Sequence, residues 1–147
     1  MTSVDEQVST PVDNDVYLEL QHFYARQMHW LDNGKVAEWA TTFTEDGVFD
    51  AAGPPVAENR AAIESAAWEV TRKYADEGIQ RRHWLGMLHA EARSDGTLVV
   101  RSYALIVFSP AGGPTAIKTS CAVEDLLVRE DGTLKVRHRR ITRDDQP

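Results

Sequence analysis

Apolar residues recur at helical spacing in the first half of the chain. The spacing predicts a helix of about five turns from residue 15 to the Asn33-Gly34 pair, a short helix over 36–43, and a third helix from about Glu58 to Tyr74. A brief strand is expected over 48–51, between the second and third helices. After Gly78 the apolar period changes from helical to two, which indicates that strands follow.

The second half predicts four long strands, rich in Val, Leu, Ile, Thr and aromatic residues: 80–93, 97–109, 115–130 and 133–143. Two Asp-Gly turns and one Gly-Gly-Pro loop separate them, and such connections join neighbouring antiparallel strands. Helices followed by a meander favour an α+β fold. Strands of this length twist and curl, so we expect the three N-terminal helices to pack on the concave face of a strongly curved, mostly antiparallel sheet around one pocket.

The length of 147 residues predicts a single domain. Residues 1–14 are polar, contain Pro11 and show no periodicity, so they are interpreted as a disordered leader. Residues 15–147 form the expected domain.

The formal charge of −7 disfavours nucleic acid and anionic membranes as partners, because binding to phosphates depends on a positive field. The basic run from Arg137 to Arg143 alternates with Val136 and Ile141, which is typical of a strand with one solvated face. No apolar stretch approaches the roughly 18 residues of a membrane span. The single cysteine, Cys121, cannot form an internal disulfide, and a cytoplasmic location is therefore expected.

The chain lacks a phosphate-binding glycine loop, a nucleophile elbow and the common metal motifs. His22 and His29 share a helix face but lie about 10 Å apart along the axis, which is too far for two ligands of one metal ion. We expect neither a metal site nor a cofactor.

Two segments, 23–34 and 38–49, resemble the opening of the SnoaL-like branch of the NTF2-like superfamily. That branch includes small polyketide cyclases, scytalone dehydratase, ketosteroid isomerase and the β subunits of ring-hydroxylating dioxygenases. The pieces that carry the resemblance are Asp32 after the first helix, the Trp39–Gly47 segment, and a histidine early in the first long strand, His83. The resemblance implies an NTF2-like cone of helices and curved sheet around a deep apolar pocket, and a homodimer formed through the outer face of the sheet.

The resemblance also implies roles for Asp32 and His83. In scytalone dehydratase an aspartate and a histidine at the matching places form a hydrogen-bonded pair, and the histidine moves the protons of the substrate. A carboxylate that accepts from one ring nitrogen fixes the tautomer and raises the basicity of the other nitrogen. Two other interpretations stay open: Asp32 as a turn residue at the helix end, and His83 as a hydrogen-bonded core residue.

An apolar and aromatic lining would suit a flat ring system. We expect the substrate-binding residues to be Tyr24, Met28, Trp39, Phe43, Phe49, Leu85, Met87, Tyr103 and Ser120. Asp125 and Glu124 are adjacent on one strand and point to opposite faces, so one of them is a second candidate base.

These residues favour a cofactor-independent proton-transfer enzyme, with His83 as general acid-base and Asp32 as its orienting carboxylate. The resemblance implies that the reaction is dehydration or cyclisation of an aromatic polyketide-like intermediate of secondary metabolism. One alternative is a non-catalytic protein, either a supporting subunit like the dioxygenase β subunits or a ligand-binding module. Another is an epoxide hydrolase of the limonene epoxide hydrolase type, for which Asp32, Arg101 and Asp125 supply the residue types.

Overall fold

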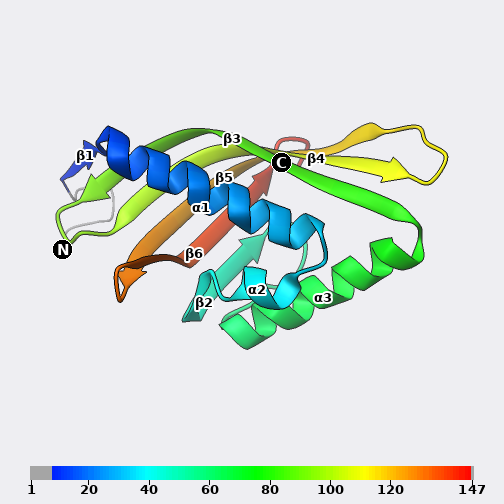
Figure 1. Cartoon of the computed structure of the whole chain (residues 1–147), viewed down its shortest axis with the longest axis horizontal. Coiled ribbons are helices and arrows are strands. Elements are labelled where there is room, and N and C mark those ends of the chain that lie inside the picture. The colour runs from blue at the N-terminus through cyan, green and yellow to red at the C-terminus, as the bar shows by residue number, and fades with distance from the viewer. Residues whose placement is uncertain (1–7, 147) are drawn as a thin grey trace.

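The computed structural model describes residues 8–146 and shows three helices beside one six-stranded sheet (Figure 1). The helices are α1 (Asn14–Asp32), α2 (Val36–Ala40) and α3 (Arg60–Asp76). The strands are β1 (Ser9–Pro11), β2 (Phe43–Ala51), β3 (Ile79–Arg93), β4 (Leu98–Pro110), β5 (Ala116–Glu130) and β6 (Thr133–Arg143). The expected α+β fold is confirmed.

The sheet is mixed and open, with the strand order β1-β3-β4-β5-β6-β2. Strands β3 to β6 form the expected antiparallel meander. Strand β2 pairs parallel to β6 and forms the edge opposite β1. Helix α1 runs across the face of the sheet, and α2 and α3 lie near β2 (Figure 1).

Polar side chains start the two long helices. The carboxylate of Asp13 accepts from the backbone N–H of Val16 at 2.9 Å, and the side chain of Asn59 accepts from that of Ala62 at 2.8 Å. Each bond satisfies one of the N–H groups that a helix leaves free in its first turn. Helix α1 ends before Gly34, whose φ of 76° lies in the left-handed region that glycine adopts without a steric penalty.

Three expected boundaries were wrong. Part of the leader expected over 1–14 has regular structure, because β1 pairs with the end of β3 and α1 begins at Asn14; residues 1–7 lie outside the described residues. The short helix ends at Ala40, and β2 begins at Phe43 rather than at residue 48. Phe43 pairs with Val136 of β6, and a register shift between Phe43 and Val48 lets the Glu45-Asp46-Gly47 segment stay within the strand.

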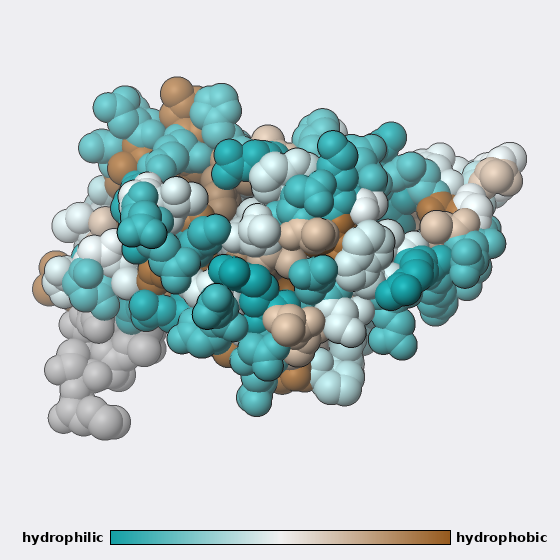
Figure 2. Space-filling view, turned by 60° about the horizontal axis from the view of Figure 1, so that its bottom comes forward, coloured by the Kyte–Doolittle hydropathy of each residue, from teal (hydrophilic) through white to brown (hydrophobic). Residues whose placement is uncertain are grey.

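The core lies between the helices and the inner face of the sheet. Apolar residues of α1, α2, α3 and β2 meet apolar residues of β3 to β6 there: Leu20, Phe23, Tyr24, Val36, Trp39, Ala40, Phe43, Ile63, Leu88, Ala90, Leu98, Val100, Leu127, Leu134 and Val136. A second, smaller cluster comprises Ala104, Cys121 and Val123, with Ile141 packed against it. The face of the molecule seen in Figure 2 is mainly hydrophilic, with apolar side chains scattered over it.

The face of the sheet that points away from the helices, called the outer face below, carries several exposed apolar side chains. Trp84 is 73% exposed, Met87 77% and Tyr103 64%.

Within residues 8–146, no helix combines the length and the apolar character needed to cross a membrane.

Candidate active site

Asp32 is the last residue of α1, and the helix end holds it against β3. The side-chain amide of Asn33 donates to the carbonyl of His29 at 2.8 Å, which closes the last turn. From β3, the side-chain amide of Gln80 donates to the backbone carbonyl of Asp32 at 3.1 Å. The carboxylate of Asp32 is therefore placed by a helix end that is itself bonded to the strand carrying His83.

His83 and Asp32 make two hydrogen bonds to each other. The Nδ1 atom of His83 lies 2.5 Å from Oδ1 of Asp32, and the backbone N–H of His83 donates to Oδ2 of Asp32 at 3.0 Å. The two side chains are 14% and 8% exposed, respectively. Both carboxylate oxygens are thus used by one residue, which fixes the orientation of the carboxylate as well as that of the ring.

This geometry assigns different tasks to the two ring nitrogens of His83. A carboxylate accepts hydrogen bonds, so in the neutral imidazole Nδ1 carries the proton and Nε2 has a free lone pair. Nε2 makes no hydrogen bond to residues 8–146 and can accept a proton from a bound molecule. The Asp32 carboxylate would then stabilise the resulting imidazolium.

The structure places six of the nine expected lining residues on the inner side of the sheet. Tyr24, Met28, Trp39 and Phe43 are buried, and Phe49 and Leu85 are half-buried. The rings of Trp39 and Phe43 pack edge to face with centroids 4.9 Å apart, and Phe49 lies about 6 Å from both. These three aromatic residues therefore form part of the packed core.

Three expected lining residues were wrong, because they lie on the outer face. A bulge in β3 between Gly86 and His89 adds a residue, so that Leu88 turns inward and Met87, with a φ of 56°, turns outward. On β4 the buried positions are Ser102 and Ala104, which leaves Tyr103 outside. Ser120 is exposed, and its hydroxyl donates to the carboxylate of Asp144 at 2.5 Å.

A buried polar network that the sequence analysis missed lies in the core between α1 and the sheet. Arg139 donates from Nε and Nη2 to the two carboxylate oxygens of Asp125, both at 2.9 Å. Tyr24 donates its hydroxyl to the same carboxylate at 2.6 Å. Arg139 also donates to the amide oxygen of Gln27 at 2.8 Å, and the Gln27 amide donates to Thr42 at 2.7 Å.

Burial and the neighbouring Asp125 carboxylate raise the pKa of Tyr24 well above its ordinary value of 10.0, so the phenol stays protonated and donating. Burial opposes the charge of Arg139, but attraction and hydrogen bonds from Asp125 outweigh it and raise the pKa of Arg139. The network is therefore a neutralised ion pair with a neutral phenol attached.

The basic run 137–143 was expected on a strand with one solvated face, and Arg139 lies on the other face, where it is 3% exposed. Of the two adjacent acids on β5, Asp125 points inward and Glu124 outward. Arg101 lies on the outer face, where it pairs with Glu124 and Glu91. The Asp32, Arg101 and Asp125 arrangement required by the epoxide hydrolase alternative is thus not formed, because Arg101 is on the opposite side of the sheet.

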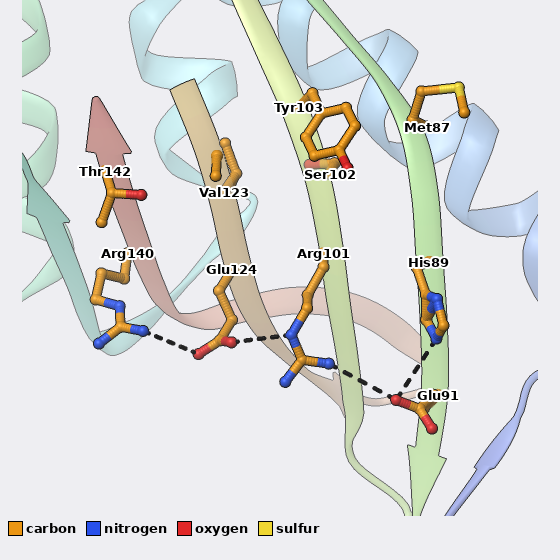
Figure 3. A pocket seen from close by; sticks show the side chains of 11 residues that line it. Met87, His89, Glu91, Arg101, Ser102, Tyr103, Val123, Glu124, Arg140 and Thr142 are labelled. Atoms are coloured by element: carbon orange, nitrogen blue, oxygen red, sulfur yellow. Dashed lines mark hydrogen bonds and ion pairs between the residues drawn. The ribbon is translucent and has the colours of Figure 1, made fainter. Parts of the chain in front are cut away.

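Two hollows lie on the outer face, and neither is lined by Asp32 or His83. One has a volume of about 490 Å³, with Met87 and Tyr103 at one end and a row of charged side chains at the other (Figure 3). The other, of about 610 Å³, lies beside it and shares Glu91, Arg101 and Glu124. Both differ from the expected apolar pocket in position and in lining.

The model of the SnoaL-like domain family matches residues 15–140. The chain belongs to the SnoaL-like domain family. A comparison with curated proteins finds no match. Family membership supports, at the level of the family, an enzyme of the cyclase or dehydratase type.

Several solved structures are similar to this SnoaL-like chain over most of its length. Aln2 from a Streptomyces species is 36% identical, with a TM-score of 0.86 over 92% of this chain and 96% of that one. ActVI-ORFA from Streptomyces coelicolor is 38% identical, with a TM-score of 0.85 over 91% and 98%. A Catenulispora acidiphila protein in complex with S-DNPA is 36% identical, with a TM-score of 0.79 over 90% and 96%.

Proposed function

We propose that the chain is a cofactor-independent dehydratase or cyclase acting on an aromatic polyketide-like intermediate. His83 is the general acid-base and Asp32 the carboxylate that orients it. The observation that carries this proposal is the pair of hydrogen bonds from His83 to one carboxylate, which leaves Nε2 for the substrate.

The proposed reaction begins when Nε2 of His83 removes a proton from a carbon next to a carbonyl group. The electrons of the C–H bond form an enolate, and the imidazolium is stabilised by Asp32. In a dehydration, the β-hydroxyl leaves with the Nε2 proton as water and a C=C bond forms. In a cyclisation, the enolate carbon attacks a second carbonyl, and the Nε2 proton goes to the new alkoxide.

The partial exposure of His83 supports this role, because a substrate can reach a ring that protein atoms do not fully cover. The half-buried Leu85 follows His83 on the same face of β3 and offers an apolar contact to a ring system. The relative bound to S-DNPA makes this compound the first ligand to test on this chain. Isothermal titration calorimetry would measure its binding.

Exchange of the α-protons of 1-tetralone in D₂O, followed by NMR, tests the proton transfer without knowledge of the natural substrate. We expect the native chain to accelerate this exchange over buffer, and His83→Ala to lower the acceleration by about 10²- to 10⁴-fold, the usual contribution of a general base. Asp32→Asn should also lower it, because an amide is a poorer partner for an imidazolium. His22→Ala, which removes an exposed histidine from α1, is the control.

Undiminished exchange in His83→Ala would refute the assignment of the base. A native chain that binds S-DNPA but exchanges no faster than buffer would favour the ligand-binding alternative. A chain that neither binds nor exchanges would favour the supporting-subunit alternative.

A further inference from the structure

Arg81 lies beside the His83–Asp32 pair. Alternate residues of a strand share a face, so Arg81 and His83 lie on the same side of β3, about 7 Å apart along the strand. Arg82 lies between them on the opposite side, and it is exposed whereas Arg81 is half-buried. The strand thus carries two adjacent arginines, of which one is on the face of His83.

Aromatic side chains hold Arg81 in place. Its guanidinium lies over the ring of Tyr74 on α3, 4.9 Å from the ring centroid. The Tyr74 ring packs edge to face against Phe108, with centroids 4.9 Å apart. Phe108 is the residue of β4 directly opposite Arg81 in the sheet. The guanidinium therefore rests on a platform built from α3 and β4.

The guanidinium of Arg81 has no ion-pair partner within residues 8–146. No carboxylate lies within ion-pair distance of its guanidinium, and none of its five N–H donors makes a hydrogen bond to a described residue. Burial lowers the pKa of Arg81, and the attraction of Tyr74 and Asp32 offsets part of that effect. The buried Arg139, by contrast, has a bidentate carboxylate partner.

A half-buried guanidinium with unused donors favours an anion, because charge-assisted bonds to a planar carboxylate are strong and geometrically matched. The field of the whole chain, with its net charge of −7, opposes any anion, so attraction has to be local. We propose that Arg81 binds a carboxylate of the aromatic substrate and so directs its reacting carbon toward Nε2 of His83. The second part of this inference rests on the proposed function.

Binding of 2-naphthylacetate and of 2-naphthylacetamide, which differ in the carboxylate alone, tests the inference without turnover. We expect the native chain to bind the acid at least about tenfold more tightly than the amide at pH 7 by calorimetry. Arg81→Gln should reduce this preference to within about twofold. Arg82→Gln makes the same change of charge on the opposite face and should keep the preference.

Two further variants test whether carboxylate binding depends on more than the charge of Arg81, and whether it is independent of the proposed catalytic base. Tyr74→Leu removes the platform and should weaken the preference while leaving the charge of Arg81 in place. His83→Ala should keep the preference, so that loss of proton exchange there concerns the proposed reaction alone. Circular dichroism of each variant confirms that it folds.

If Arg81→Gln and Arg82→Gln reduced the preference for the acid over the amide equally, the inference would be overturned, since the effect would then be one of overall charge. A native chain that prefers the acid by less than about twofold, or binds neither compound, would overturn it as well.

Discussion

Arg139 and Asp125 form an ion pair that is almost completely removed from water. Moving two charges into a protein interior is costly, and their attraction offsets the cost only when hydrogen bonds satisfy both groups. Here Tyr24 and Gln27 complete that set of bonds. The four side chains also join α1 to β5 and β6, because they come from all three elements.

We predict that Arg139→Met destabilises the fold by about 3–5 kcal/mol, because it leaves the Asp125 carboxylate buried without a counter-charge. Urea unfolding followed by tryptophan fluorescence measures the change. The triple variant Tyr24→Phe, Asp125→Leu, Arg139→Met replaces the charges with apolar groups. It should regain part of the free energy of unfolding that Arg139→Met loses. A change below about 1 kcal/mol in the single variant would contradict this account.

The contact between Asp32 and His83 could be predicted from sequence, because a helix end and a strand carry two residue types that a known family pairs. The burial of Arg139 could not. Strict alternation along β6 from the inward Val136 would place residue 139 outside. A register shift between Leu126 and Leu127 puts an extra residue, Arg137, into β6 and turns Arg139 inward. Single bulges of this kind leave no clear signal in residue type.

At the scale of elements, α1 both contributes to the core and positions the site. Its buried residues recur at helical spacing, at Leu20, Phe23, Tyr24, Gln27 and Met28. This stripe fixes the rotation of the helix on the sheet and thereby the direction in which Asp32 leaves its last turn. A local error in packing under α1 would therefore also displace the carboxylate.

An ion pair at the surface joins α1 to the end of β5. Both guanidinium ends of Arg129 donate to the carboxylate of Glu19, at 2.9 and 2.7 Å. The hydrogen bond from Arg129 is the main reason that the pKa of Glu19 is lowered from 4.5. A lowered pKa means that the pair contributes stability above the ordinary pKa, and that this contribution is lost as the pH falls through the lowered value.

We predict that Glu19→Gln lowers the free energy of unfolding at pH 7 by less than about 1 kcal/mol, since the pair is exposed and screened. The difference from the native chain should shrink as the pH falls below 4.5 through the lowered pKa of Glu19, and it should vanish once Glu19 is protonated in the folded chain. Thermal melts of both chains at pH 7 and over a series of acidic pH values measure this difference. Glu38→Gln, on an exposed residue of α2, is the control; an equal effect there would attribute the change to net charge.

The period of the apolar pattern predicted three helices and four long strands, because burial on one face imposes that period directly. It could not predict the full length of β2, since Glu45-Asp46-Gly47 has the composition of a turn. The pairing of β2 beside β6 is set by contacts between distant segments. Such contacts depend on the whole fold rather than on local propensity.

For the whole molecule, the outer face combines exposed apolar side chains with an ordered row of charges. From β6 to β3 the row is Arg140, Glu124, Arg101 and Glu91, and each charge lies within 4 Å of the next (Figure 3). A two-fold axis parallel to the strands and between β4 and β5 would set every charge opposite one of the other sign. We propose that two copies of the chain pair through this face, with Trp84, Met87 and Tyr103 as its apolar contacts.

Reversal of one charge in the row tests this proposal. Glu124→Arg sets like charges opposite each other and should weaken the dimer at least about tenfold in sedimentation equilibrium. Adding Arg101→Glu restores opposite signs across the axis and should restore the dimer. A native chain that sediments as a monomer at high micromolar concentration would refute the proposal.

The bond from the main-chain N–H of His83 to Asp32 has a consequence for the evolution of this scaffold. A peptide N–H is present whichever residue, other than proline, occupies position 83, so the carboxylate stays anchored when the side chain there is exchanged. One codon change could thus swap the reactive group without rebuilding its support. Related proteins with this fold can therefore acquire a different reactive group at position 83 by single substitutions, while the Asp32 carboxylate stays in place.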